Sequence, residues 1–185
     1  MRVIAGKHRS RPLISPKNSD VRPTTDMIKE SIFNIIQNDV IDCDFLDLFA
    51  GSGAIGIEAI SRGANKVVFC DNSKESIKLI KQNLAMLKEE AEILFGDYEY
   101  ALTRLKNRQF DIIFLDPPYE FKDIKAVLNK IAENNVLSDT GIVIFESLYD
   151  KNFDKNVEGF NIIKSKKYGI TAIDIYERIV WKNVW

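Results

Sequence analysis

The sequence predicts an α/β fold: a doubly wound, mostly parallel sheet of seven strands, with a C-terminal antiparallel hairpin at one edge. Five short apolar runs alternate with helical stretches between residues 45 and 147. The runs are continuous rather than alternating, which is typical of parallel strands covered by helices on both faces. Two longer β-prone runs then meet around "KKYG" with no helix between them. This change of pattern indicates the hairpin.

Short stretches of the chain define the individual elements. Thr24 or Thr25 can cap a first helix. Four isoleucines of that helix share one face: Ile28, Ile32, Ile35 and Ile36. The parallel strands are predicted at residues 45–50, 66–71, 91–97, 110–116 and 141–147. Near the N-terminus, "RVIAG" and "RPLIS" can pair as a small hairpin.

The composition is that of one soluble globular domain. The chain has 185 residues, of which 45% are apolar and 29% charged, and its net charge is −1. No apolar run approaches the roughly 18 residues that span a bilayer, and the N-terminus lacks the order of a signal peptide. We therefore expect a cytoplasmic protein that does not enter a membrane, and a monomer.

Cysteine and histidine usage gives no sign of metal or disulfide chemistry. Cys43 and Cys70 are the only cysteines, and neither belongs to a C-x-x-C motif. We expect both to be buried structural thiols in a reducing compartment. No His/Cys cluster has metal-ligand spacing, so no catalytic metal is expected.

Positive charge is concentrated at the start of the chain. Residues 1–23 carry six basic side chains and one acidic side chain, Asp20. We divide the chain into this basic arm or hairpin, residues 1–23, and an α/β domain, residues 24–185. A basic arm can contact nucleic acid, and the alternative is a solvated surface segment.

A glycine-containing turn follows the first predicted strand in "DLFAGSGAIGIEA". Asp47 stands near the strand end, and Gly51, Ser52 and Gly53 follow it ahead of a helix. Glycines at a strand-to-helix turn let the backbone approach a ligand closely. A site for a nucleotide phosphate would not have an acid at its mouth, because the acid would repel the anion that the helix N-terminus binds. Asp47 instead suits a ligand with a positive group, such as an α-amino group or a sulfonium.

Further acids stand at the ends of the next strands. Asp71 can accept hydrogen bonds from ribose hydroxyls, and Asp97 can accept one from an adenine amino group. For a single acid the simpler interpretation is a helix cap, which Asp71 could provide for "NSKES". Carboxylates at the ends of four strands, counting Asp116, favour a ligand site at the carboxyl edge of the sheet.

The stretch "FLDPPYE" indicates chemistry on an amine. The Asp116 carboxylate and the Pro117 carbonyl can stabilise positive charge that develops on an attacking nitrogen. Pro117 and Pro118 fix these acceptors in place. Tyr119 offers a flat face on which a base can stack. The alternative is a proline turn after a buried strand.

Two stretches, "FLDLFAGSGAIGIEA" and "FLDPPYE", resemble the Rossmann-like class I methyltransferases that transfer a methyl group from S-adenosylmethionine to exocyclic amines. "MRVIAGKHRSRPL" and "VRPTTDMIKESIFNII" narrow the resemblance. Together they are similar to the bacterial 16S ribosomal RNA guanine-N2 methyltransferase D family, which acts on the guanine at position 966. The resemblance extends to "YGITAIDIYER", so it covers nearly the whole chain.

The resemblance implies roles for particular residues. Asp47, Gly51 and Gly53 would hold the methionine end of the cofactor, Asp71 its ribose and Asp97 its adenine. Residues 116–119 would hold the guanine amine. Arg22 and Thr24 would lie near the pocket, and the arm, with Arg9 and Arg11, would bind RNA in an assembled or assembling small ribosomal subunit. Two positions depart from the family pattern: Asp71 stands where glutamate is frequent, and Tyr119 where phenylalanine is frequent.

Three other functions are compatible with parts of this pattern. Adenine-N6 methylation of DNA uses the same acid-Pro-Pro-aromatic motif, although the chain has little room for a domain that reads DNA sequence. Glutamine-N5 methylation of a protein would be favoured if the basic arm had no role. A catalytically silent RNA-binding module would not need the glycine turn and the acids at the strand ends.

Overall fold

The computed structural model describes residues 1–16, 26–118, 121, 123–150 and 154–179. The helices are α1 (Asp26–Ile35), α2 (Ala54–Arg62), α3 (Lys74–Leu87), α4 (Tyr98–Arg104) and α5 (Ile124–Glu133). The strands are β1 (Asp44–Asp47), β2 (Lys66–Asp71), β3 (Glu92–Phe95), β4 (Phe110–Leu115), β5 (Leu137–Leu148), β6 (Phe160–Tyr168) and β7 (Thr171–Arg178).

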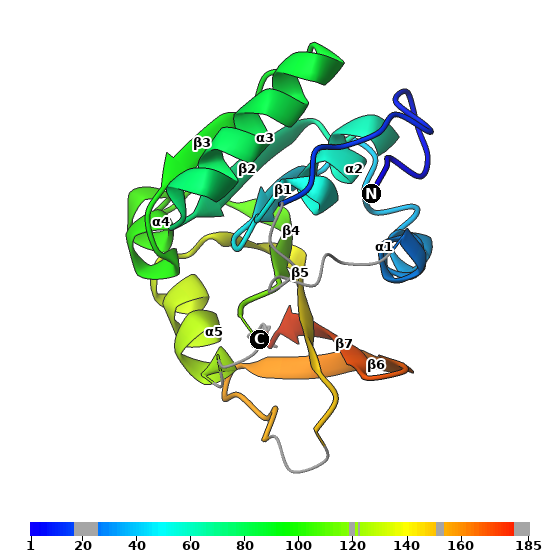
Figure 1. Cartoon of the computed structure of the whole chain (residues 1–185). Coiled ribbons are helices and arrows are strands. Elements are labelled where there is room, and N and C mark those ends of the chain that lie inside the picture. Colours follow the sequence, from blue (N-terminus) through cyan, green and yellow to red (C-terminus); the bar gives the residue numbers. More distant parts are fainter. Residues whose placement is uncertain (17–25, 119–120, 122, 151–153, 180–185) are drawn as a thin grey trace.

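The strands form one seven-stranded sheet in the order β3-β2-β1-β4-β5-β7-β6 (Figure 1). Strands β1 to β5 run parallel to one another, whereas β7 is antiparallel to both β5 and β6. The predicted doubly wound sheet and its C-terminal hairpin are therefore confirmed. The order reverses at β1 and β4, which puts the ligand crevice of such sheets at the carboxyl ends of these two strands.

Helices cover both faces of the sheet. One apolar cluster joins the inner faces of α1, α2 and α3 to the sheet, through side chains such as Ile32, Ile57 and Ile80. The other cluster joins α4 and α5 to the opposite face, through Leu102 and Leu128 among others. Burial on both faces explains why the parallel strands appear as continuous apolar runs. The alternation that remains within each strand decides which face each side chain enters.

Several element ends differ from the prediction. β1 ends at Asp47 rather than at residue 50, because the chain turns there into the glycine loop. β3 ends at Phe95 rather than at residue 97, because Asp97 is the N-cap of α4. β5 begins at Leu137, before Gly141, because Leu137 already pairs with Phe110 of β4. The predicted capping of α1 by Thr24 or Thr25 lies outside the described residues.

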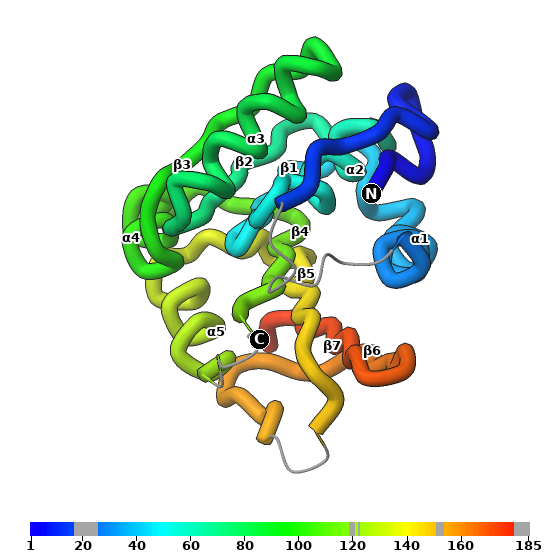
Figure 2. Tube along the Cα trace, in the orientation of Figure 1, coloured from blue at the N-terminus to red at the C-terminus, as the bar shows by residue number. Residues whose placement is uncertain are grey.

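The N-terminal segment folds back on itself and lies against α2 and α3 (Figure 2). The Val3 amide donates to the Arg11 carbonyl, and an antiparallel bridge joins Arg2 to Pro12. The predicted pairing of "RVIAG" with "RPLIS" is thus present as a single bridge with flanking hydrogen bonds. Val3 and Leu13 are buried in the cluster of α1, α2 and α3, so the segment shares the core of the domain.

A buried ion pair between α1 and α2 fixes the start of the chain. Glu58 is fully buried and its carboxylate accepts hydrogen bonds from the amides of Ile4 and Ala5. The ammonium of Lys29, also fully buried, lies 3.4 Å from Glu58 and donates to the Arg2 carbonyl. Burial lowers the pKa of Lys29, and the nearby Glu58 carboxylate opposes that shift.

We predict that Glu58→Gln destabilises the fold strongly. The substitution keeps the shape of the side chain but leaves the buried Lys29 without its counter-charge. Removing one partner of a buried pair costs about 3–5 kcal/mol, which urea unfolding would measure. Glu90→Gln, an exposed change in the segment that follows α3, is the matched control, with an expected change within about 0.5 kcal/mol. Equal midpoints for the two variants would contradict the role of Glu58.

Candidate active site

A tight turn links β1 to α2 and leaves open space beside its backbone at Gly51. Gly51 and Gly53 have positive φ angles of 53° and 79°. A Cβ added at Gly51 would meet no atom within 4 Å, so the backbone there faces open space that a ligand can enter. A Cβ added at Gly56 would lie 2.3 Å from the Phe69 ring, which shows that this glycine lets α2 approach β2. The turn therefore has the form predicted for a cofactor loop.

Asp47 is a buried carboxylate at the base of this turn. Only 1% of the residue is exposed, and its Oδ2 accepts a hydrogen bond of 2.9 Å from the Gly56 amide. Burial raises the pKa of Asp47 to about 7, the Gly56 hydrogen bond opposes that shift, and the charges of Asp116 and Asp71 add to it. A positive group beside Asp47 would offset both the cost of burying its charge and the repulsion from Asp116 and Asp71.

Asp71 fastens the glycine loop to β2. Its Oδ2 accepts from the Gly51 amide at 2.8 Å, and its Oδ1 accepts from the Ser73 amide at 2.8 Å. The N-cap of α3 is Ser73, whose hydroxyl accepts from the Ser76 amide. Ser73 therefore caps α3, which was the alternative role considered for Asp71. Each Asp71 oxygen has a second lone pair for a hydroxyl donor.

Asp97 does cap a helix. Its Oδ1 accepts from the Tyr100 amide at 2.8 Å, at the start of α4. Beside it, the rings of Phe49, Tyr98 and Phe121 form a cluster with centroids 5.8–6.0 Å apart. This cluster brings together the segments that follow β1, β3 and β4, and so forms an apolar wall next to Asp97.

A cavity of about 310 Å³ opens at the carboxyl ends of β4 and β5. Asp116, Pro117, Pro118 and Phe121 line one side, and residues 145–150 line the other. The cavity is large enough for a nucleobase and places the Asp-Pro-Pro segment at its wall. The predicted stacking residue Tyr119 lies outside the described residues.

The strand-end acids project from one face of the sheet. Two residues before each of Asp47, Asp71 and Asp116 stands a buried phenylalanine of the cluster formed with α1, α2 and α3. Because side chains of a strand alternate between faces, Asp47 and Asp71 leave the sheet on that same face, and the charge of Asp116, just past the end of β4, acts on Asp47. Asp47 and Asp71 are close enough to Gly51–Gly56 and to each other to act on one ligand.

Sequence reasoning missed two residues of this region. Asn83 of α3 is fully buried; its Oδ1 accepts from the Ile14 amide, and its Nδ2 donates to the carbonyls of Ile14 and Ser52. It thereby ties the N-terminal segment to the glycine loop, and nothing in the local sequence signals this. Glu146 lines the cavity at the end of β5. The acid that closes "GIVIFE" was a readable signal, since it matches the endings of the other strands.

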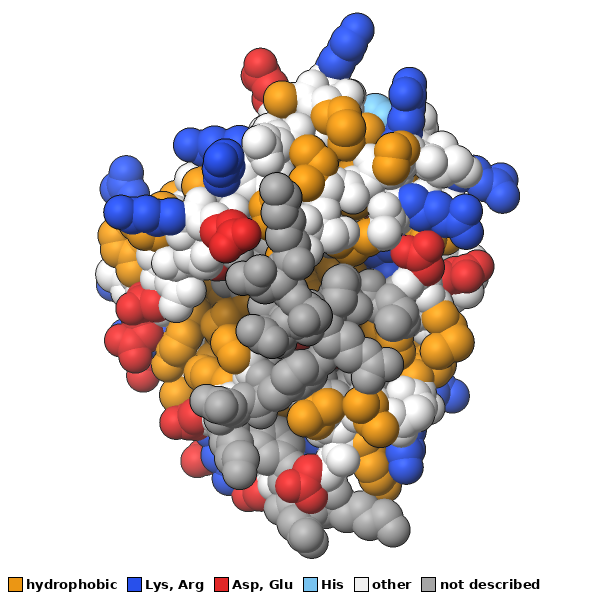
Figure 3. All heavy atoms as spheres, in the orientation of Figure 1, with side chains coloured by type: hydrophobic (Ala, Val, Ile, Leu, Met, Phe, Trp, Pro, Cys, Tyr) orange, Lys and Arg blue, Asp and Glu red, His pale blue; other side chains and the backbone are white. Residues whose placement is uncertain are grey.

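Basic side chains lie on the segment that Asn83 and Glu58 hold down. Lys and Arg side chains gather on the upper part of the face in Figure 3, where the N-terminal segment lies. Arg9 and Arg11 are exposed, and neither forms an ion pair with another described residue. Lys7 is paired with Glu89 at 2.7 Å. Arg22 and Thr24, predicted near the pocket, lie outside the described residues.

The cysteines are buried, as predicted, and burial raises the pKa of both Cys43 and Cys70 to about 12. They are therefore inert thiols rather than nucleophiles. Within the described ranges, no group of three or more His, Cys, Asp or Glu side chains is arranged to hold a metal ion. Over the same residues, every helix is too short or too polar to cross a membrane.

Comparison with known proteins identifies the family. Residues 1–177 match the protein family described as "Conserved hypothetical protein 95". Ribosomal RNA small subunit methyltransferase D of Haemophilus influenzae is 35% identical over 181 residues, which are 96% of this chain and 93% of that protein. The chain belongs to this methyltransferase family. The resemblance noted in the sequence is thereby confirmed.

Other members agree over nearly the whole chain. YlbH of Bacillus subtilis is 38% identical over 182 residues, covering 96% of this chain and 99% of that protein. The solved structure of yhhF from Escherichia coli superposes with a TM-score of 0.85 at 29% identity, covering 96% of this chain and 97% of that one. The class I methyltransferase fold therefore holds for the molecule as a whole, including the N-terminal segment.

We predict that the stability of the protein depends on pH through Asp47. Its pKa is raised from 3.8 to about 7 in the folded state. Its contribution to stability is therefore fully present below pH about 4 and is lost as the pH rises through about 7. Asp47→Asn removes this loss, so the stability of the variant relative to the original protein should rise by a few kcal/mol between pH 4 and pH 8.

Urea midpoints of the two proteins, measured in parallel across that range, test the prediction. Asp139→Asn, an exposed change at the start of β5, controls for the loss of one surface charge. A constant difference between the Asp47→Asn variant and the original protein at every pH would contradict the raised pKa.

Proposed function

We propose that this protein transfers a methyl group from S-adenosylmethionine to the N2 amine of the guanine at position 966 of 16S ribosomal RNA. The single observation that carries the proposal is the cavity wall formed by Asp116, Pro117 and Pro118 beside the carboxylates of Asp47 and Asp71. Membership of the family supports the substrate, because several members bear the name ribosomal RNA small subunit methyltransferase D.

The residues present fit the cofactor. The open space at Gly51 admits a ligand against the backbone of the turn. The buried Asp47 carboxylate favours a cation, and we assign it, with Gly51, Ser52 and Gly53, to the methionine end of the molecule. Asp71 would accept from the ribose, and Asp97, next to its aromatic wall, from the adenine. When bound, S-adenosylmethionine supplies an electrophilic methyl group on a sulfonium.

The Asp-Pro-Pro segment would prepare the amine. The lone pair of an exocyclic amine is delocalised into the ring, and attack on the methyl carbon builds positive charge on nitrogen. Acceptors fixed at Asp116 and at the Pro117 carbonyl would stabilise that charge and direct the lone pair toward the methyl group. Once the amine carries the methyl group, Asp116 or water would accept the extra proton of the nitrogen.

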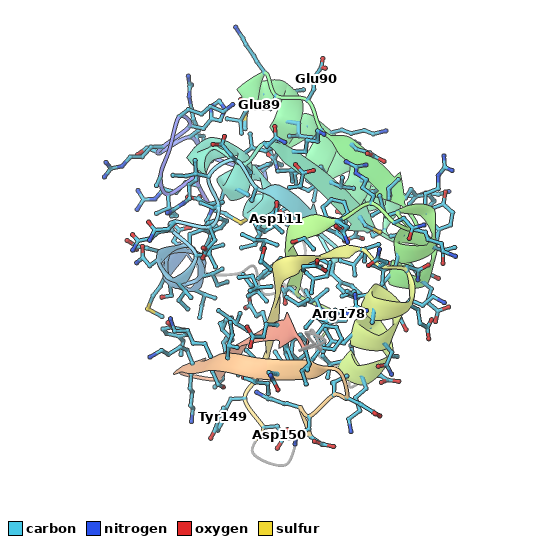
Figure 4. The ribbon with its side chains drawn as sticks, turned by 180° about the vertical axis from the view of Figure 1, so that it is seen from behind. Glu89, Glu90, Asp111, Tyr149, Asp150 and Arg178 are labelled. Carbon is cyan, nitrogen blue, oxygen red and sulfur yellow. The ribbon has the colours of Figure 1, made fainter. Side chains whose placement is uncertain are left out.

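The basic arm would hold the RNA. Arg9 and Arg11 are exposed on a segment that is itself fastened to the glycine loop through Asn83. In Figure 4, Glu89, the partner of Lys7, lies just past the end of α3, whereas Tyr149 and Asp150 of the cavity rim lie at the opposite end of the molecule. A small catalytic domain with a separate basic grip suits a base displayed by a folded RNA particle. We place the reaction in the cytoplasm, on an assembled or assembling small subunit.

We predict that Asp116→Asn nearly abolishes methyl transfer and leaves affinity for S-adenosylmethionine largely intact. The variant keeps the shape of the side chain and removes the charge that would stabilise the reacting nitrogen, so the rate should fall about 100-fold or more. Labelled S-adenosylmethionine would be offered with unmodified small subunits, naked 16S RNA and DNA in parallel, followed by digestion to nucleosides. Asp139→Asn, at the other end of β5, is the matched control and should keep full activity.

Label in N2-methylguanosine, mainly from the subunits, is the expected result. Label in N6-methyladenine from DNA would overturn the substrate and retain the fold and cofactor site. A fully active Asp116→Asn variant would remove Asp116 from the reaction.

We predict that the double variant Arg9→Gln, Arg11→Gln binds small subunits more weakly and with a flatter dependence on salt. Each lost phosphate contact reduces the slope of log K against log salt by about 0.7–0.9. Binding is measured by filter retention at several salt concentrations. Arg104→Gln with Lys106→Gln, two exposed changes at the end of α4, is the charge-matched control. An unchanged slope in the arm variant would exclude the arm from the RNA interface.

A further inference from the structure

The fifth strand, β5, carries an acid, Glu146, near its end at the active-site edge. Leu115 of β4 pairs with Phe145 of β5 in parallel register. The residues that follow this last pair are Asp116, just past the end of β4, and Glu146, still within β5. Both residues line the cavity.

The two carboxylates project from the same face of the sheet. Phe114 and Ile144, which pair with each other, both belong to the apolar cluster of α1, α2 and α3. Glu146 follows Ile144 by two residues within β5, so alternation returns its side chain to that face. Asp116 lies just past β4, and its charge acts on Asp47, whose side chain leaves the sheet on the same face. The base-binding cavity thus presents two neighbouring acceptors rather than the one that the Asp-Pro-Pro motif supplies.

Guanine and adenine, the two candidate bases, differ in hydrogen-bonding character at N1, the ring nitrogen next to the amine. Guanine carries a hydrogen on N1 beside its N2 amine, so it presents two adjacent donors. Adenine has a lone pair on N1 beside its N6 amine, so it presents a donor next to an acceptor. Two carboxylates side by side match the edge of guanine. With adenine, one carboxylate would face the N1 lone pair. Such a mismatch of buried polar groups strongly disfavours the wrong substrate.

We propose that Glu146 reads the target base by accepting a hydrogen bond from N1–H of guanine while Asp116 holds the N2 amine. This inference rests on the proposed function and assigns its base specificity to a residue outside the Asp-Pro-Pro motif. An ionised carboxylate has about four acceptor sites, so contacts of Glu146 within the protein leave room for the base. Ser147, the next residue along, also lines the cavity, and its buried hydroxyl has no hydrogen-bond partner among the described residues.

The test compares two bases that share the reacting amine. Small subunits are reconstituted with ligated 16S RNA that carries either guanine or 2-aminopurine at the target position. 2-Aminopurine keeps the 2-amino group but has a lone pair at N1. The original protein should methylate guanine about 10- to 100-fold faster, the value of one hydrogen bond to a charged group. Glu146→Gln, whose amide can donate to N1, should shrink this ratio at least about fivefold.

A charge-matched control separates recognition from a general effect. Asp139→Asn removes a carboxylate from the exposed start of β5, outside the cavity lining, and should keep the original ratio. 2-Aminopurine also lacks the oxygen at position 6. The loss of this oxygen changes the ratio of the two rates equally for every variant, so its effect cancels when the ratios of two variants are compared. If the Glu146→Gln variant methylates neither base, the affinities of the variant for the guanine and the 2-aminopurine subunits are measured at equilibrium instead of the rates. A ratio of affinities equal to that of the original protein would contradict the inference.

The remaining outcomes distinguish the inference from the function on which it rests. An original protein that forms N2-methylguanosine but methylates 2-aminopurine equally well would overturn the role of Glu146 and leave the proposed function intact. A Glu146→Gln variant that keeps the original ratio would do the same. An original protein that forms no N2-methylguanosine on guanine subunits would overturn the proposed function and the inference together.

Discussion

The buried Asp47 carboxylate, held by the Gly56 amide, is the constraint on which the active-site region depends. The hydrogen bond joins the end of β1 to the first turn of α2, so it sets the direction in which α2 leaves the sheet. It also fixes the loop between them, whose Gly51 amide is held from the other side by Asp71. The same burial that makes Asp47 costly in its ionised form, with a pKa of about 7, makes a positive ligand favourable beside it. Structural and chemical roles therefore meet in one side chain.

The acids at the strand ends form a single row because of the geometry of a parallel sheet. Parallel strands bring their carboxyl ends to one edge, and alternation sends side chains two residues apart to one face. Asp71, Asp47, Asp116 and Glu146 satisfy both conditions and follow the strand order β2-β1-β4-β5. The expected partner is a ribose for Asp71, a cation for Asp47, and the hydrogen-bond donors of a base for Asp116 and Glu146. A methyl group carried between the second and third positions would stand in front of the amine, which is the arrangement that the transfer requires.

The sequence predicted most of the fold, and it singled out the glycine turn and the strand-end acids from which the candidate site is built. The sheet, its hairpin and the strand-end acids were accessible because continuous apolar runs and their endings are local signals. Asn83 was not accessible, because its three hydrogen bonds join Ile14 and Ser52, which are distant in the chain. The buried pair of Lys29 and Glu58 was hidden for a related reason: both residues stand in amphipathic helices whose periodicity does not show that a charge is turned inward. Glu146 was missed although its signal was local, since the strand-end rule was applied to four strands and not to the fifth.

The central claim is that Asp47 receives the positive end of the cofactor, and proton release on binding tests it most directly. Calorimetric titration of S-adenosylmethionine at pH 6, in two buffers with different ionisation enthalpies, gives the number of protons exchanged. Since Asp47 is largely protonated in the free protein at that pH, binding of a cation beside it should release close to one proton, and the release should vanish by about pH 9. It should also vanish in Asp47→Asn. Binding without proton release at pH 6, or with equal release from Asp47→Asn, would contradict the account.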